Sequence, residues 1–254
     1  MPDIKLVAID LDGTLLKNDL TISPRAEEAI KEATAKGVYV TICTGRMYAS
    51  ALPYIKQLEM KLPVIAYNGA LVKHAATGEV LYRKLLPCPM ATDIYIRAKK
   101  HKLHTNIYYN DDLYVDSLND WADNYARKVG VDINIVENMV EFLQCDPITK
   151  IVTIANPDAL KFLRQELEED YGEKLFITSS LPHLLEILNP EATKGKGLET
   201  VANYLDIPRE CVMGIGDSFN DIEMFEYAGL SVVMANGEEE VKKIANYVTC
   251  SNDD

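Results

Sequence analysis

The chain has 254 residues, 48% of them hydrophobic, and carries 26 Lys and Arg against 39 Asp and Glu, a formal net charge of −13. This length and apolar share suffice for one large domain or two smaller ones with buried cores. The negative charge repels nucleic-acid phosphates and anionic membrane surfaces, so we expect no nucleic-acid partner. No stretch approaches 18 consecutive apolar residues, which predicts no membrane partner.

The five cysteines are scattered along the chain and form no C-x-x-C pair. This pattern indicates neither a disulfide framework nor a zinc site, and it suits reduced thiols. The first ten residues, MPDIKLVAID, lack the basic and then apolar segments of a secretion signal. Together these features predict a cytoplasmic location.

Short apolar runs alternate with helical patterns, which is typical of parallel βαβ units. The run Leu6 to Ile9 comes first, and its continuous apolar character suits a strand covered on both faces. Ser23-Pro24 then offers an N-cap and a proline at the first helical position, and Gly37 ends that helix. Further strands are predicted at residues 38–43, 63–67, 211–215 and 230–234.

Polar residues and glycines follow the predicted strands at their ends. The segments are DLDGT at 10–14, TGR at 44–46, NG at 68–69 and GDSFND at 216–221. In open α/β sheets, ligands bind outside the carboxyl ends of the strands. The sequence therefore predicts one site assembled from four loops.

The pattern changes between residues 83 and 188, where Tyr- and Ile-rich strands alternate with amphipathic helices. The predicted helices lie near 90–102, 118–129 and 157–170, and the predicted strands at 105–109, 113–115, 148–154, 175–178 and 184–188. We expect a second unit of residues 83–188 inserted into a core of residues 1–82 and 189–254. Prolines near both junctions are expected to act as hinges.

Asp10 and Asp12, one residue apart at a strand end, are suited to covalent chemistry. One carboxylate can attack as a nucleophile, while the other protonates the leaving oxygen and then deprotonates a water. Attack by an anion on a phosphate dianion requires charge neutralisation, which Mg²⁺ with Asp217 as a further ligand can supply. Thr44 and Lys194 can contact phosphate oxygens. These residues indicate phosphoryl transfer.

The four motifs, in this order and together with Lys194-Gly195, resemble the signatures of the haloacid dehalogenase-like hydrolases. The insert is similar to that of the Cof/YidA-type sugar-phosphate phosphatases, and the resemblance covers almost the whole chain. It implies an α/β fold with a Rossmann-like core, a doubly wound and mostly parallel sheet, and an inserted α+β cap domain of type C2 that selects the substrate.

The resemblance also implies residue roles. Asp10 would form an aspartyl-phosphate and Asp12 would be the general acid and base, which favours prompt hydrolysis. Mg²⁺ would be held by Asp10, the Asp12 carbonyl and Asp217, with Asp221 supporting the metal's waters or Lys194. The implied phosphate- and substrate-binding residues are Leu11, Thr44, Gly45, Arg46, Asn68, Gly69, Lys194 and Asn220. We expect the partner to be a small phosphorylated metabolite, foremost a sugar phosphate, and the chain to be a monomer or weak homodimer.

Some alternatives stay open. A phosphomutase would use the same two aspartates, and a non-catalytic module would bind a phosphorylated metabolite without turnover. Arg46 either contacts the substrate or pairs with an acidic neighbour. Glu186 near the end of the insert and Asn189 just after it are candidate substrate contacts by position alone. The tyrosines of the insert are expected to serve packing, and the four histidines are expected to be surface or packing residues. Similar proteins continue beyond the final SNDD, an absence expected to affect stability more than chemistry.

Overall fold

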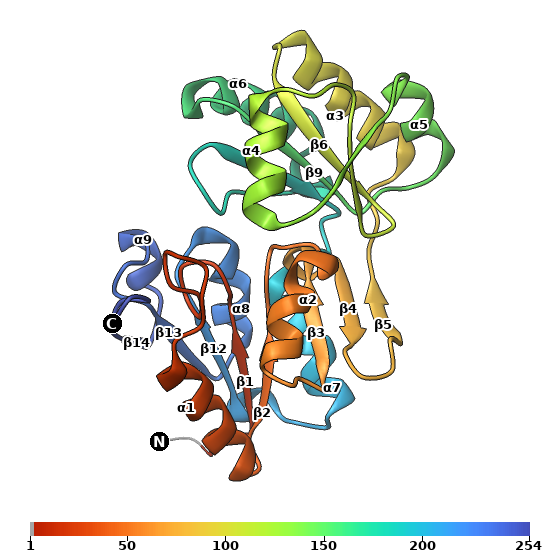
Figure 1. Ribbon diagram of the computed structural model, residues 1–254. Coiled ribbons are helices and arrows are strands. Elements are labelled where there is room, and N and C mark those ends of the chain that lie inside the picture. Colours follow the sequence, from red (N-terminus) through yellow and green to blue (C-terminus); the bar gives the residue numbers. More distant parts are fainter. Residues whose placement is uncertain (1–2) are drawn as a thin grey trace. The chain divides into compact units, whose positions relative to one another are not determined.

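The computed structural model describes residues 3–254. The chain divides into two compact units (Figure 1). The first comprises residues 3–45, 51–83 and 193–254, and the second comprises residues 46–50 and 84–192. The first two residues of the expected core lie outside the described residues, and the assignment of separate roles to the two units stays a prediction. Within residues 3–254, no helix combines the length and apolar character needed to cross a membrane.

A five-stranded sheet forms the centre of the first unit, with every neighbouring pair parallel and the order β14-β13-β12-β1-β2. Its strands are β1 (Leu6–Ile9), β2 (Tyr39–Ile42), β12 (Val212–Gly216), β13 (Leu230–Val233) and β14 (Tyr247–Val248). The unit's helices are α1 (Pro24–Ala35), α2 (Tyr48–Gln57), α7 (Lys194–Tyr204), α8 (Ile222–Tyr227) and α9 (Glu239–Lys242). Helices α1 and α2 lie on one face of the sheet and α7 and α8 on the other (Figure 1). The predicted doubly wound fold is confirmed.

The strand predicted at residues 63–67 forms, but it does not belong to the parallel sheet. It forms β3 (Pro63–Ala66), which pairs antiparallel with β4 (Leu71–His74), and β4 in turn pairs with β5 (Val80–Arg83). A single parallel bridge between Cys43 and Ile65 links β3 to the end of β2. Because this link is so short, β3 belongs to a separate antiparallel sheet, although its end still lies beside that of β2.

Alternate side chains of β1 bury one face of the parallel sheet against α7 and α8. Leu6 and Ala8 are fully buried in a cluster with Leu198 of α7 and Met224 of α8. Successive strand side chains point to opposite faces, so these two residues meet the same helix layer. Burying the Leu6 side chain contributes about 1.5–3 kcal/mol, and burial of both residues anchors the strand that leads into Asp10.

The second unit contains a six-stranded sheet in the order β10-β11-β9-β6-β7-β8. All neighbouring pairs are antiparallel except β7 and β8. The strands are β6 (His104–Tyr109), β7 (Asp112–Val115), β8 (Ile133–Ile135), β9 (Lys150–Ile154), β10 (Phe176–Thr178) and β11 (Leu184–Leu188). The helices are α3 (Cys88–Lys100), α4 (Asp120–Val129), α5 (Met139–Cys145) and α6 (Pro157–Tyr171). Strand β8 and helix α5 were not predicted.

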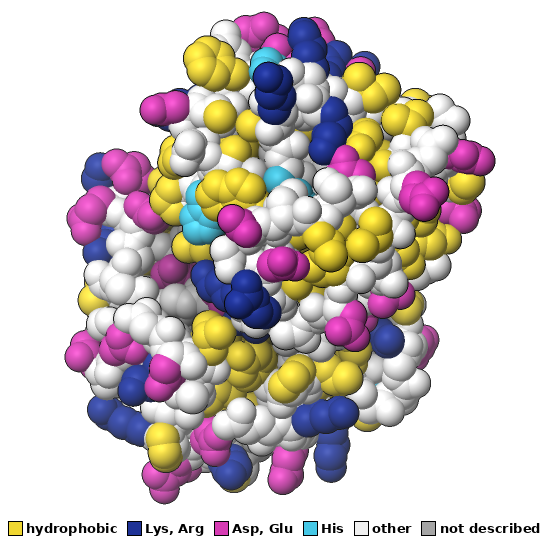
Figure 2. Space-filling model, turned by 45° about the horizontal axis from the view of Figure 1, so that its top comes forward, with side chains coloured by type: hydrophobic (Ala, Val, Ile, Leu, Met, Phe, Trp, Pro, Cys, Tyr) yellow, Lys and Arg dark blue, Asp and Glu magenta, His cyan; other side chains and the backbone are white. Residues whose placement is uncertain are grey.

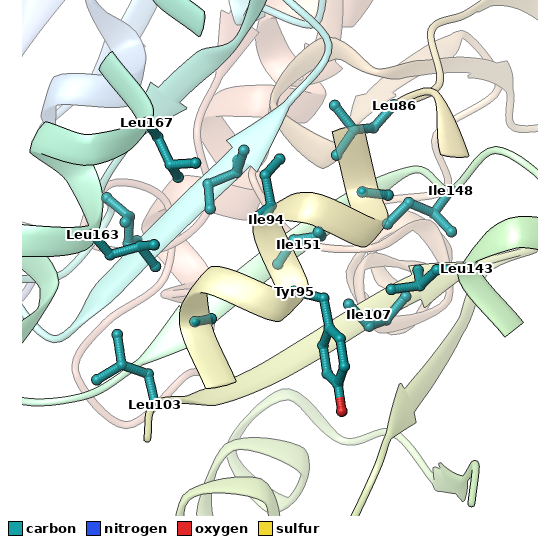
Figure 3. Close-up of a cluster of buried hydrophobic side chains, with 14 of the residues drawn as sticks. Leu86, Ile94, Tyr95, Leu103, Ile107, Leu143, Ile148, Ile151, Leu163 and Leu167 are labelled. Carbon is teal, nitrogen blue, oxygen red and sulfur yellow. The ribbon is translucent and has the colours of Figure 1, made fainter. Parts of the chain in front are cut away.

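One face of this sheet carries the hydrophobic core of the second unit. Ile107, Ile151 and Ile187, from the neighbouring strands β6, β9 and β11, are fully buried in one cluster with residues of α3, α5 and α6. Figure 3 shows this cluster around α3. Because side chains alternate along a strand, the residues before or after these isoleucines point to the opposite face.

Candidate active site

Three carboxylates gather at the carboxyl ends of β1 and β12. Asp10 follows β1, Asp217 follows β12, and Asp221 ends the short 3₁₀ helix η4 (Phe219–Asp221). One oxygen atom from each lies within 4.8 Å of the others. The strands bring them together because the parallel register pairs Ile9 with Ile215 and ends both strands at the same edge of the sheet.

Lys194, the first residue of α7, is fully buried among these carboxylates. Its Nζ donates to Asp10 Oδ1 and to Asp221 Oδ1, both at 2.6 Å. The helix begins here because the Thr193 side chain accepts a hydrogen bond from the Lys196 amide at 3.2 Å. The Lys196 side chain is exposed and pairs with Glu199. Lys194 is therefore the lysine that reaches the carboxylates.

The cluster contains more acidic groups than basic groups. Burial, together with the neighbouring carboxylates of Asp221 and Asp217, raises the pKa of Asp10 well above its usual value, although Lys194 opposes the shift. Burial and Asp221 raise the pKa of Asp217 to about 7. Burial alone would lower the pKa of Lys194, but Asp10 and Asp221 outweigh it and the pKa is raised. One ammonium thus faces three carboxylates, an arrangement that a bound cation would relieve.

The turn after Asp10 folds onto Asp217. Leu11 is buried and Asp12 is exposed. The Thr14 hydroxyl donates to Asp217 Oδ1 at 2.9 Å. Gly13 has φ +79°, and a Cβ at this position would lie 2.4 Å from Asp217 Oδ2. Glycine is required here because a side chain would collide with the carboxylate and strain the backbone.

Residues from the loops after β2 and β3 meet Asn220 beside the cluster. Asn220 Nδ2 donates to Asn68 Oδ1 at 3.0 Å, and the Asn68 amide donates to the Thr44 carbonyl at the same distance. A Cβ on Gly45 would lie 2.7 Å from Asn68 Oδ1. Thr44, Asn68 and Asn220 are all buried. The structure thus brings together four residues that the sequence placed on three loops.

Gly69 and Arg46 stand apart from this group in different ways. Gly69 has φ +97°, and a Cβ there would lie 1.9 Å from the Thr193 carbonyl oxygen. It therefore permits the close approach that sets the start of α7, and with it Lys194. Arg46 is buried and belongs to the second compact unit.

Asp221 has both carboxylate oxygens engaged. Oδ1 accepts from Lys194, while Oδ2 accepts from the backbone amides of Asp217 and Ser218, each at 3.0 Å. Of the two roles that the sequence left open, support of Lys194 or of a metal's waters, the contacts favour Lys194.

Three residues at this end of the sheet were missed by sequence reasoning. The Thr14 hydroxyl contacts Asp217, Asn236 Nδ2 donates to the Gly13 carbonyl at 2.8 Å, and Asn252 Nδ2 donates to the Leu16 carbonyl at 2.9 Å. The two asparagines lie more than 200 residues from their partners in sequence. No local spacing pattern signals such contacts.

A family model of haloacid dehalogenase-like hydrolases matches residues 7–254. The chain therefore belongs to this hydrolase family, and the resemblance seen in its motifs is confirmed. Its enzyme class, a hydrolase acting on phosphoric monoesters, agrees with relatives that are named phosphatases.

The chain is 32% identical to the 5-amino-6-(5-phospho-D-ribitylamino)uracil phosphatase YitU of Bacillus subtilis, covering 98% of this chain and 93% of the relative. It is also 32% identical to YwtE of the same organism, which has the same activity name, over 99% and 94% of the two chains. Among solved structures, a Thermotoga maritima protein is 34% identical with a TM-score of 0.84, covering 99% of this chain and 94% of that one. A haloacid dehalogenase-like hydrolase from B. subtilis is 26% identical with a TM-score of 0.89, covering 98% and 96%.

Proposed function

We propose that this protein is a Mg²⁺-dependent phosphatase that hydrolyses small phosphate monoesters, foremost sugar phosphates, through an aspartyl-phosphate on Asp10. The observation that carries the proposal is the buried Lys194, which holds Asp10 and Asp221 at 2.6 Å beside the further carboxylate of Asp217. A buried cluster with this excess of negative charge suits the binding of a cation and, with it, a phosphate group.

In the proposed mechanism, Asp10 Oδ attacks the phosphorus and the bond to the leaving oxygen breaks. Asp12 donates a proton to that oxygen, which leaves as an alcohol. Asp12 then takes a proton from a water, whose oxygen attacks the phosphorus of the aspartyl-phosphate. This second step releases inorganic phosphate and restores the Asp10 carboxylate. Lys194 orients Asp10 and offsets its charge, while Thr44 and the amides of Leu11 and Gly45 hold phosphate oxygens.

The residues present fit Mg²⁺, which prefers hard oxygen ligands. The Asp10 and Asp217 carboxylates and the Asp12 backbone carbonyl would hold it, with Asp221 acting through Lys194. When bound, Mg²⁺ supplies positive charge that offsets the negative charge of the nucleophile and the phosphoryl group.

The B. subtilis relatives YitU and YwtE bear the name of a phosphatase acting on a phosphorylated ribityl compound, which carries several hydroxyl groups. We extend this chemistry to the present chain: its substrates are phosphate monoesters with a hydroxyl-rich organic part, either a sugar or a ribityl chain. The second unit, acting as a cap domain, would select that part by excluding water and contacting it. A cytoplasmic location and a monomeric or weakly dimeric state remain predictions.

The test is release of inorganic phosphate from p-nitrophenyl phosphate and a panel of sugar and ribityl phosphates, with Mg²⁺ and with EDTA. Asp10→Asn removes the nucleophile and should lower kcat by about 10³-fold or more. Chelation of the metal should abolish turnover in the unchanged protein. Glu32→Gln, which replaces an exposed carboxylate on α1, is the matched control and should retain full activity.

Two results would redirect the proposal. Phosphate release that needs a bisphosphate activator, with transfer between sugar positions, would favour the phosphomutase. Tight binding of phosphorylated metabolites by folded, metal-loaded protein without any turnover would overturn the phosphatase in favour of the binding module.

A further inference from the structure

A cavity of about 410 Å³ lies at one end of the six-stranded sheet of the second unit. It is formed where β6 begins and β9 ends, because His104 and Ile154 are register partners and both line it. The end of α3 and the starts of α4 and α6 complete the lining. All of its described lining residues belong to the second unit. The volume is typical of small-molecule sites, which measure about 300–1,000 Å³.

This cavity is remote from both ends of the segment that forms most of the second unit. Helix α3 starts at Cys88, close to the first end at Lys84, and its 13 residues extend about 20 Å toward the cavity. Strand β11 starts at Leu184, the register partner of Ile154, and leads away from the cavity toward the second end of the segment at Ala192. The cavity is therefore a feature of the second unit by itself.

The lining of this cavity is basic, although the protein is acidic. The chain has 39 acidic against 26 basic residues, yet of the ten described residues that line the cavity two are lysines and none is acidic. Lys99 forms an ion pair at 2.5 Å with Asp116, which lies outside the lining. Lys102 is exposed and has no ion pair within residues 3–254. The charge of Lys102 is therefore available to an anionic ligand.

The backbone at Lys102 adopts a conformation that favours glycine. The Lys102 amide donates to the Lys99 carbonyl at 2.9 Å, so Lys102 is the residue through which the chain leaves α3. The residue at this place in a helix C-terminus has a left-handed φ and is usually glycine. Gly37 occupies it after α1 with φ +85°, whereas Lys102 has φ +57°. A lysine that is kept here despite the backbone strain indicates a use for its side chain.

Trp121 and Asn156 add two further recognition groups to the lining. Trp121, in the first turn of α4, is 43% exposed, and its indole ring offers a face on which a planar group can stack. Leu103 and Ile154 make the wall more apolar. Asn156 is the N-cap of α6, but its side chain makes no capping hydrogen bond and has no partner within residues 3–254. The N-termini of α4 and α6 carry partial positive charge, which also favours an anion.

We propose that this cavity binds a small organic anion with a planar ring, such as an aromatic carboxylate or phosphate. Lys102 pairs with the anionic group, the Asn156 amide donates a hydrogen bond to it, and the ring stacks on Trp121 against the apolar wall. The site shares no residue with the cluster around Asp10. It therefore does not depend on the proposed phosphatase function, and its ligand need not be a substrate.

The test uses the fluorescence of Trp121, which is the only tryptophan in the chain and therefore reports on this cavity. Phenylphosphonate, whose C–P bond resists hydrolysis, should change the fluorescence of EDTA-treated protein saturably, with a Kd of about 1 mM or below. Methylphosphonate lacks the ring and benzyl alcohol lacks the charge, so each should bind about tenfold more weakly. Lys102→Gln should weaken phenylphosphonate binding about tenfold. Lys100→Gln is the matched control, because Lys100 is an exposed lysine of α3 outside the lining, and its affinity should stay unchanged.

Two further variants keep this test decisive. Lys102→Gly should lose the affinity while its Tm stays at or above that of the unchanged protein, because glycine suits the left-handed backbone. Asp10→Asn should bind phenylphosphonate as the unchanged protein does, and a loss of binding there would place the ligand in the first unit and overturn the site. No saturable fluorescence change, with no heat of binding by calorimetry, would also overturn it, as would equal weakening in Lys100→Gln and Lys102→Gln. Missing turnover would contradict only the phosphatase.

Discussion

Lys194 neutralises only part of the negative charge that surrounds it, and the remaining charge contributes to the raised pKa of Asp217. Burial and the nearby Asp221 raise the Asp217 pKa to about 7, while the Thr14 hydroxyl and Lys194 oppose the shift. Without metal, Asp217 therefore keeps its proton in the folded state at pH values where the unfolded chain has lost it. Metal and proton compete for the same carboxylate.

This competition predicts how stability depends on pH. The raised pKa of Asp217 stabilises the metal-free fold below about pH 4, and this contribution is lost as pH rises to about 7, at up to about 1.4 kcal/mol per pH unit. Chemical unfolding of EDTA-treated protein between pH 5 and 8 should show this decline, and Asp217→Asn should make it shallower. Mg²⁺ should stabilise the unchanged protein more at pH 8 than at pH 5. An identical slope in the variant would show that Asp217 does not titrate in this range.

At the scale of elements, the C-terminal segment holds the loop that follows β1. Asn252 Nδ2 donates to the Leu16 carbonyl, the Asn18 amide donates to Asp253 Oδ1 at 3.0 Å, and the Asn252 amide donates to Asn236 Oδ1 at 3.0 Å. Asn236 in turn donates to Gly13. The tail is thus connected to the turn that contains Asp12, so we expect its removal to disturb that turn as well as to lower stability.

Deletion of residues 252–254 should therefore lower kcat as well as stability. Each lost hydrogen bond contributes about 1 kcal/mol, and for a chain of this size each kcal/mol corresponds to about 2–4 °C in Tm. We expect Tm to fall by several degrees, and kcat to fall about three- to tenfold at a temperature where the variant is fully folded. Removal of Asp254 alone, whose hydrogen bonds within the described residues are to Ser251, is the control. Unchanged kcat after the longer deletion would limit the tail to a structural role.

Considered as a whole, the molecule carries a net charge of −13 yet is proposed to bind an anion. On the face drawn in Figure 2, Lys and Arg side chains are interspersed with Asp and Glu rather than gathered into one broad positive surface. Attraction of the substrate must then come from local charges, such as Lys194 and a bound metal, against the long-range field.

Salt should therefore increase the rate of substrate capture. Raising KCl from about 10 to 150 mM shortens the Debye length from about 30 to 8 Å, which screens the long-range repulsion more than the contacts within the site. At constant free Mg²⁺, kcat/KM for a phosphate dianion should rise about twofold. Repeating the series with choline chloride separates screening from specific ion effects. A steady fall in kcat/KM with either salt would show that an attractive field dominates.

Much of the fold and the residues of the site followed from local patterns. Apolar runs placed β1, β2 and β12, and the residues that follow these strands include Asp10, Thr44 and Asp217. The β4–β5 hairpin, β8 and α5 were missed, and β3 was placed in the wrong sheet. These elements are short, and their pairing partners are chosen by packing rather than by their own residues.

The sequence by itself determined the family, the strand ends that carry the motifs, and the excess of acidic residues, because strand periodicity, helix caps and motif spacing are properties of neighbouring residues. Only the tertiary structure decided that Lys194 pairs with both Asp10 and Asp221 and that Asn252 holds the loop after β1. It also decided that Asn106 Nδ2 is buried without a hydrogen-bond partner among residues 3–254. Such features depend on strand register and on contacts between distant segments, which are settled only when the whole chain has packed.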